Sequence, residues 1–340
     1  MNRGESSGRV TRADVAAAAG TSVAVVSYVV NNGPRPVSAA TRARVLDAIE
    51  LTGYRPDVVA RALAGGFTHT FGLLVPDVSN RFFAELAHQV EEHVYASGHL
   101  ILLADSADDP VRERELMNAL MERRVDGIML ASVDADPDLS GAIAGGTPVV
   151  LLDRIAPSAL TSSVVPDNMG GARAATEHLI GHGHRRIGFI AGPSGLPTSQ
   201  DRTAGWAGAL AAAGLERGPL VEAPFSRSGG LEAGRRLLRG ADRPDAVFAS
   251  NDQQAVGLLR AAHDLGIRVP EDLGVITFDG SQDAAFAIPS LSSVVQPLAE
   301  IAEHAVRLLL ARPHVTARVT TGHTLALRAS CGCPDGPTSP

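Results

Sequence analysis

Several short apolar segments of this chain end in side chains that can bind a polar ligand. An aspartate or asparagine follows four of them, at Asp77, Asp153, Asn251 and Asp279. If these segments are parallel strands, their carboxyl ends meet at one edge of a sheet, where doubly wound folds bind ligands. Carboxylate and amide groups suit the hydroxyls of a sugar or a nucleoside. The alternative is that each side chain caps the helix that follows it.

The motifs that would indicate an enzyme or a cofactor site are missing. The glycine clusters do not complete a dinucleotide-binding pattern, no Walker loop can form without lysine, and no nucleophile elbow is present. His178, His182 and His184 are close in sequence, but two of them fall in an expected turn. Cys331 and Cys333 lack the spacing of a structural zinc site. We therefore expect no catalytic residues, no metal and no cofactor.

Length and composition indicate a folded protein of two or three domains. Of its 340 residues, 45% are hydrophobic and 20% are charged, enough to bury a large core. No apolar run reaches the roughly 18 residues of a membrane helix. The polar N-terminus also lacks the apolar stretch of a secretory signal, so we expect a cytoplasmic protein. The first 66 residues carry a net charge of +3 and the whole chain −7, so only the N-terminal part is expected to meet a polyanion.

The first sixty residues predict three short helices. Thr11 and Asp14 form a capping-box pattern that opens the first helix, and Gly20 ends it. The second helix is expected over 23–30, and Ser38 caps the third. Two helices joined by a short turn with glycine form the helix-turn-helix that places one helix in a DNA groove.

From residue 70 onward, short apolar runs alternate with amphipathic stretches of helical length. This alternation indicates parallel strands buried between helices, the doubly wound α/β arrangement. The runs are too many for one small sheet, so we expect two lobes. The expected strands are 71–75, 100–103, 127–131, 149–152, 187–191, 247–250 and 275–278. The expected helices between them include 82–97, 112–124, 170–181, 203–213 and 252–265.

Motifs in both parts of the chain resemble those of the lactose-repressor family of bacterial transcription regulators. In the N-terminal part they are VTRADVAAAAGTS (10–22), VSYVVN (26–31), VSAATR (37–42) and GYRP (53–56). Farther on they are GLLVPD (72–77), NRFF (80–83), HRRIG (184–188), RTAGW (202–206) and ND (251–252). The motifs occur in the family's order, and the resemblance runs from about residue 10 to residue 330.

The resemblance implies a helix-turn-helix head and a core like the periplasmic sugar-binding proteins. The implied parts are a disordered N-terminus (1–9), the head (10–55), a hinge helix (56–67), a two-lobed effector-binding and dimerisation domain (68–330) and a frayed tail (331–340). Lobe one is expected at about 68–165 and 294–325, and lobe two at about 166–293. The family also uses the helices at 82–97 and 112–124 for its dimer interface, with internal packing as the alternative.

In the family, the start of the second helix reads bases, and the matching positions are Val23, Ala24 and Tyr28. Val23 and Ala24 depart from the commoner polar pattern and can only pack, for instance on a thymine methyl, so Tyr28 is the one polar reader. The alternative is a buried helix face, which we expect for Val26, Val29 and Val30. The family's phosphate contacts match Ser22, Asn31, Ser38, Thr41 and Tyr54.

Leu63 matches the hinge-helix leucine that the family wedges into a central minor-groove step of the operator. Unstacking that step costs a few kcal/mol, which the bent complex offsets by enclosing more surface. Ordinary packing in an alanine-rich linker is the alternative.

The resemblance also assigns an effector site. The family's sugar- or purine-contacting positions match Asp153, Arg202, Asn251 and Asp279, with Phe225 and Gln296 as wall residues. Asp77, Arg81 and Phe82 are expected to line the other lobe. An aromatic ring such as Phe82 or Phe225 would cover the apolar face of a sugar ring. The retained Arg202, Asn251 and Asp279 favour a sugar over a nucleoside.

Together these features predict a homodimeric repressor of carbohydrate genes that binds a near-palindromic operator and responds to a sugar. A solute-binding protein without DNA readout is the first alternative, disfavoured by the head and by the missing signal. An enzyme on the same fold is the second.

Overall fold

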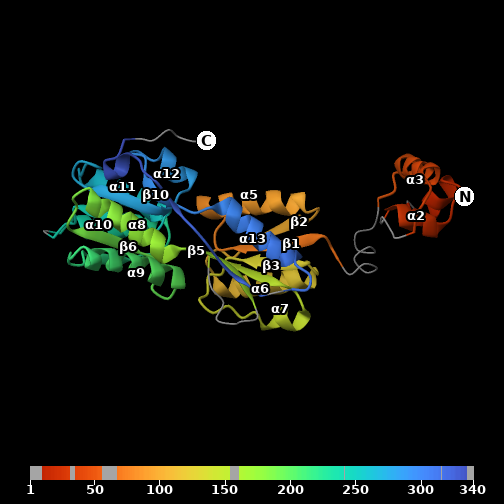
Figure 1. Ribbon diagram of the computed structural model, residues 1–340, viewed down its shortest axis with the longest axis horizontal. Helices are drawn as coiled ribbons and strands as arrows, with labels where there is room; N and C mark the ends of the chain where they lie inside the picture. The colour runs from red at the N-terminus through yellow and green to blue at the C-terminus, as the bar shows by residue number, and fades with distance from the viewer. Residues whose placement is uncertain are drawn as a thin grey trace, which may run out of the picture. The chain divides into compact units, whose positions relative to one another are not determined.

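The computed structural model describes residues 10–30, 35–55, 67–153, 161–240, 242–314 and 316–334. The chain divides into two compact units, Met1–Thr68 and His69–Pro340 (Figure 1). The expected disordered N-terminus, the hinge segment 56–66 and the predicted DNA contacts Asn31 and Leu63 lie outside the described residues.

The first unit is the predicted three-helix head, with α1 (Arg12–Ala18), α2 (Val23–Val30) and α3 (Ala39–Thr52). Its predicted caps are confirmed: Thr11 and Asp14 form a complete capping box, and the Ser38 side chain accepts from the backbone N–H of Thr41. The bend between α1 and α2 is 105°, within the usual range for a helix-turn-helix. The three helices bury a small shared core of Val15, Ala16, Ala19, Val26, Val29, Val45, Ala48 and Tyr54.

No single helix within the described ranges is long and apolar enough to cross a membrane. Length and composition alone would admit α1 and α2 taken together as a bent pair.

Lobe one of the second unit is a six-stranded parallel sheet of order β11-β5-β4-β3-β1-β2. Its strands are β1 (Thr70–Val75), β2 (Leu100–Asp105), β3 (Gly127–Leu130), β4 (Val149–Leu152), β5 (Ser162–Pro166) and β11 (Arg318–Thr321). Its helices are α5 (Arg81–Ala96), α6 (Pro110–Glu122), α7 (Ser140–Gly145) and α13 (Leu298–Leu310).

Side chains alternate across this sheet, so each face buries a core of its own. Phe71 and Leu73 of β1 pack on the face covered by α5 and α13, whereas Leu74 packs with α6 and α7 (Figure 1). The apolar stripe of α5, including Leu86 and Val90, lies in the first of these cores. These side chains of α5 therefore pack inside lobe one, whereas Tyr95 near the end of the same helix is 73% exposed.

Lobe two has the strand order β12-β10-β9-β8-β6-β7, parallel except for the β10–β12 pair. Its strands are β6 (Ile187–Ala191), β7 (Leu220–Glu222), β8 (Ala246–Ala249), β9 (Gly274–Asp279), β10 (Ser292–Val295) and β12 (Thr324–Ala326). Its helices are α8 (Asn168–Gly181), α9 (Pro197–Ala212), α10 (Arg227–Leu238), α11 (Asp252–Asp264) and α12 (Gln282–Phe286). α8 and α9 pack on one face of this sheet, and α10 and α11 on the other.

The chain crosses between the lobes three times, which moves two of the expected boundaries. β10 and β12 pair within the sheet of lobe two, so only α13 and β11 return to lobe one, not all of 294–325. A 3-10 helix, Ala329–Cys331, then packs on lobe two, where the Ser330 hydroxyl donates to the Val275 carbonyl at 2.7 Å. Cys331 is buried, so the tail expected to fray from residue 331 begins in an ordered segment.

Candidate functional site

The carboxyl ends of the two sheets border a cleft lined by residues of both lobes. One cavity of about 270 Å³ is lined by Pro76, Asp77, Asn80, Phe83, Asp108, Val133, Asp153, Pro193, Leu196, Thr198, Pro224 and Phe225. An adjoining cavity of about 40 Å³ is lined by Asn80, Phe82, Phe83, Asp153, Thr198, Arg202, Phe225, Asn251 and Asp279. The two share five lining residues, so they are parts of one ligand cleft.

Arg202 of α9 is the charged centre of this cleft. It is buried, its Nε donates to Asn168 Oδ1 at 2.9 Å, and its Nη1 donates to the Ser250 carbonyl at 2.6 Å. Its guanidinium also lies 3.8 Å from the centre of the Phe278 ring. These contacts fix the guanidinium at the wall of the smaller cavity, where it can meet a ligand.

Asp279 at the end of β9 lies beside this arginine, with 3.7 Å between its Oδ1 and Arg202 Nη1. The same oxygen accepts from Gln296 Nε2 at 3.0 Å. Burial raises the pKa of Asp279 well above its ordinary value, although the Arg202 charge opposes the shift. The Arg202 charge therefore stabilises the charged form of Asp279. A ligand hydroxyl that donates to this carboxylate would replace part of the hydration that burial removes.

Asp279 and Asp153 have left-handed backbones, with φ of 109° and 61°. Such conformations cost roughly 1–3 kcal/mol in a residue other than glycine and are concentrated at functional sites. Asp153, which follows β4 of lobe one, lines both cavities, and its carbonyl accepts from Thr198 Oγ1 of lobe two at 3.3 Å. The strand-end position predicted for these two carboxylates is the one observed.

The two interpretations of the strand-end polar residues, ligand binding and helix capping, can be compared at Asn251 and Asp252. Asn251 caps α11, since its Oδ1 accepts from the Gln254 N–H at 2.9 Å, but it also lines the cleft. Asp252 accepts from the Ser281 N–H and hydroxyl, both at 2.7 Å, and is a structural residue. Burial raises the pKa of Asp252 to about 6.

Aromatic rings form the apolar part of the cleft wall. Phe82 is buried and meets Phe83 edge to face, with 5.1 Å between ring centres. Phe225 lies over Gly192, where an added Cβ would come within 2.1 Å of the ring. Glycine is thus required at position 192 for the Phe225 ring to reach the cleft.

Two of the nine predicted effector residues lie elsewhere. Arg81 lines neither cavity, because its Nε binds Glu85 at 2.7 Å and its Nη2 reaches across to Gln282 Oε1 of lobe two at 2.7 Å. It therefore bridges the lobes instead of facing the ligand cleft. Gln296 is buried behind Asp279 and positions that carboxylate. The other seven line the cleft, with Asp77 in the larger cavity only.

Sequence reasoning missed Asn80, Phe83 and Thr198 as lining residues and Asn168 as the partner of Arg202. Asn80 carries a signal in the sequence because it precedes a helix, and it does cap α5 through the Phe82 N–H at 3.1 Å. Thr198 contacts Asp153 of the other lobe, and Asn168 reaches Arg202 through the packing of α8 on α9, so no local pattern reveals either contact.

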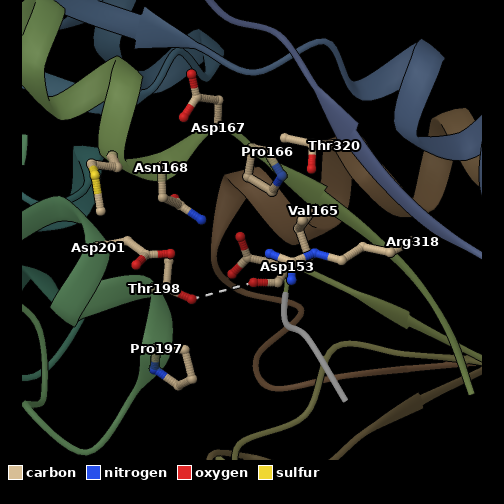
Figure 2. A pocket seen from close by; sticks show the side chains of 11 residues that line it. Asp153, Val165, Pro166, Asp167, Asn168, Pro197, Thr198, Asp201, Arg318 and Thr320 are labelled. Atoms are coloured by element: carbon tan, nitrogen blue, oxygen red, sulfur yellow. Dashed lines mark hydrogen bonds between the residues drawn. The ribbon is translucent and has the colours of Figure 1, made fainter. Parts of the chain in front are cut away.

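A further cavity of about 240 Å³ adjoins the cleft and shares Asp153 and Thr198 with it. Figure 2 shows the carboxylates of Asp153 and Asp201 pointing toward its interior, with Arg318 entering from β11. Burial raises the pKa of Asp201, and the Arg318 charge partly opposes this.

In the head, the predicted base readers lie on the accessible side of α2. Val23 is 46% exposed, Ser22 and Ala24 are exposed, and Tyr28 is half-buried with the Arg35 guanidinium 5.8 Å from its ring centre. The buried face that we expected is present at Val26 and Val29, while Val30 is half-buried.

Four of the predicted phosphate contacts make hydrogen bonds within the head, and one of them, Ser22 Oγ, accepts from the Val25 N–H at 3.3 Å. Ser38 Oγ donates to Thr41 Oγ1 at 2.9 Å. The ring of Tyr54 is buried in the core of the head, and its hydroxyl accepts from Arg12 Nε at 3.2 Å. Any phosphate contact by Tyr54 is therefore limited to its hydroxyl.

Comparisons with known proteins agree with this architecture. Residues 11–57 match the family model described as bacterial regulatory proteins, lacI family, and residues 176–331 match a periplasmic binding protein-like domain. The HTH-type transcriptional repressor PurR of Photobacterium profundum is 35% identical over 303 residues, 88% of this chain and 90% of that protein.

Two solved structures resemble most of the chain. A transcriptional regulator CelR–cellobiose complex has 33% identity and a TM-score of 0.72 over 95% of this chain and 100% of that one. The lac repressor dimer bound to operator and the anti-inducer ONPF has 26% identity and a TM-score of 0.82 over 95% of this chain and 99% of that one. With its helix-turn-helix head and two-lobed ligand-binding core, this chain belongs to the lacI family of bacterial regulatory proteins and is a DNA-binding transcription regulator.

Proposed function

We propose that this regulator represses carbohydrate uptake or breakdown genes in the cytoplasm and responds to a sugar bound in the cleft. The observation that carries the proposal is the buried Arg202–Asp279–Gln296 array beside Asn251, facing Asp153 and aromatic walls. Paired donors and acceptors match ring hydroxyls, while Phe82 and Phe225 match the apolar face of a sugar. The similar CelR structure holds cellobiose. We expect no catalytic activity from this site.

The regulator is proposed to act as a homodimer on a near-palindromic operator, one head on each half-site. Apolar side chains gather at the exposed edge strand β2 and its neighbours: Tyr95, Leu100, Leu102, Leu103 and Val111 are between 39% and 73% exposed. An exposed apolar sheet edge invites a partner. A second copy of this edge would cover it, as expected for a protein that must place two heads on DNA.

The coupling of ligand to DNA is proposed to run through lobe closure. The described residues join the lobes near the cleft by Thr198 to Asp153, by Arg81 to Gln282, and by the Gln282 N–H to Glu85 at 3.0 Å. A sugar that forms hydrogen bonds to both lobes would stabilise the closed arrangement, in which these contacts form, relative to the open one. The difference in its affinity for the two arrangements then sets how far it can shift operator binding.

The test is a titration of purified protein onto DNA flanking its own gene, followed by fluorescence anisotropy at fixed salt, with random DNA as control. A panel of mono- and disaccharides and nucleosides is added to the complex. We expect a site bound about 1,000-fold more tightly than random DNA, and one sugar that changes this affinity. A nucleoside as the only effector would overturn the sugar assignment, and no preference for any DNA site would overturn the repressor assignment.

A further inference from the structure

A cluster of two histidines and two cysteines lies on lobe two, away from the ligand cleft. His178 and His182 are one helical turn apart at the C-terminal end of α8. Cys331 ends the 3-10 helix that follows β12, and Cys333 lies two residues beyond it. One ligand atom from each of the four side chains lies within 4.8 Å of the other three. Residues about 150 positions apart in the chain therefore converge on one point.

The separations within the cluster match the edges of a metal tetrahedron. Zn–S bonds of about 2.3 Å and Zn–N bonds of about 2.0–2.1 Å place nitrogen and sulfur ligands about 3.5 Å apart at tetrahedral angles. His178 Nε2 lies 3.2 Å from Cys331 Sγ and 3.6 Å from Cys333 Sγ. His182 Nε2 lies 3.3 Å from Cys333 Sγ. These three separations are close to those expected of ligands that share one zinc ion.

The first cysteine is buried and held in place by a neighbouring hydroxyl. Ser292 Oγ donates to Cys331 Sγ at 3.0 Å, the kind of outer hydrogen bond that fixes a metal ligand. Thiolates, not thiols, bind zinc.

We propose that His178, His182, Cys331 and Cys333 form a structural Zn²⁺ site that ties the C-terminal segment to α8. Two thiolates and two neutral imidazoles balance the charge of the ion, and any thiol proton still present passes to solvent on binding. The four protein ligands complete a tetrahedral shell with no open position, which distinguishes a structural site from a catalytic one. The ion would hold residues 331–333, which are not part of a strand, against α8.

The first measurement uses full-length, tag-free protein, reduced and stripped of metal, titrated with Co²⁺ and then with Zn²⁺. We expect one Co²⁺ per chain, with the visible bands of tetrahedral cobalt and a thiolate charge-transfer band, both lost on addition of Zn²⁺. Zinc content of protein purified without added metal should approach one ion per chain. Co²⁺ bands typical of octahedral oxygen ligands, or no bands at all, would overturn the proposal.

Variants then test the ligands. Cys333→Ser and His182→Asn alter residues that are not buried, so the apo fold should tolerate them, and each should weaken Co²⁺ binding roughly 100-fold or more. His88→Asn removes an exposed histidine of α5 and should change nothing. Chelation should lower the Tm of the wild type and leave that of Cys333→Ser unchanged. Tetrahedral cobalt bands retained in Cys333→Ser, or a Cys331–Cys333 disulfide that persists under reducing conditions with Zn²⁺ present, would contradict the site.

Discussion

The head and the ligand cleft use their polar groups in opposite ways. At the cleft, Arg202 and Asp279 are buried beside each other, and Gln296 holds Asp279 from behind. On the accessible side of α2, Val23 and Ala24 are exposed and have no polar side-chain atoms. We therefore expect the cleft to recognise its ligand through a preorganised array, and the head to read DNA mainly through backbone contacts, packing and one tyrosine.

Asp279→Asn should have the largest effect, because it should alter the ligand cleft and leave the head unchanged. Asparagine has the same shape and tolerates the positive φ at this position, so the fold should persist. Loss of the charge beside Arg202 should weaken effector binding roughly 100-fold, about 3 kcal/mol, measured by calorimetry. Affinity of the effector-free protein for operator should not change. Asp264→Asn, on the exposed end of α11, is the matched control, and an unaltered effector response in Asp279→Asn would remove this carboxylate from the site.

The buried carboxylates should make the stability of the core depend on pH. The pKa of Asp252 is raised from 3.8 to about 6 in the folded protein, so folding takes up a proton in this range. This contribution is complete below about pH 4 and is lost as the pH rises through about 6. Relative to Asp252→Asn, the wild type should lose up to about 3 kcal/mol over this range. Urea unfolding of both proteins between pH 4 and 8 measures it, and a constant difference would contradict the assignment.

Leu63→Ala tests the hinge wedge that the sequence predicts. We expect about a tenfold loss of operator affinity, roughly 1–2 kcal/mol, because the apolar wedge supports the bent complex only on the specific site. The affinity for random DNA, measured by anisotropy, and the affinity for the effector, measured by calorimetry, should stay constant. An equal loss on operator and random DNA would rule out the wedge.

Tyr28→Phe should have the smallest effect. Removal of one hydroxyl that bonds to a base costs about 1 kcal/mol, or about fivefold in operator affinity. Binding to an array of operators with single-base changes should also show relaxed preference at one position in each half-site. Unchanged affinity and unchanged preference would mean that α2 reads its site by packing alone.

The architecture was predictable because each element has its own local pattern. The capping residues Thr11 and Ser38 fixed the starts of α1 and α3, and buried runs such as Val149–Leu152 matched observed strands. Five strands were missed: β7 and β12 have only three residues each, and β5, β10 and β11 mix polar with apolar residues, so none of them forms an apolar run. Strand-end carboxylates could be predicted because parallel strands bring their carboxyl ends together.

What sequence reasoning missed depends on long-range contacts. Arg81 follows the cleft-lining Asn80, yet Gln282 of the other lobe draws it out of the cleft. Cys331 and Cys333 have no zinc-site spacing by themselves, and the histidines that approach them lie on a helix about 150 residues earlier. Gln282 reaches Arg81 only after the chain has crossed to the second lobe, and the cysteines reach the histidines only after it has crossed back from lobe one.

The central claim is that the cleft and the head are coupled, and reciprocity tests it most directly. The effector Kd is measured by calorimetry with and without saturating operator, and the operator Kd by anisotropy with and without saturating effector. We predict the same factor in both pairs, within the 5- to 150-fold range of typical allosteric couplings. An effector that binds equally well to free and operator-bound protein would contradict the account.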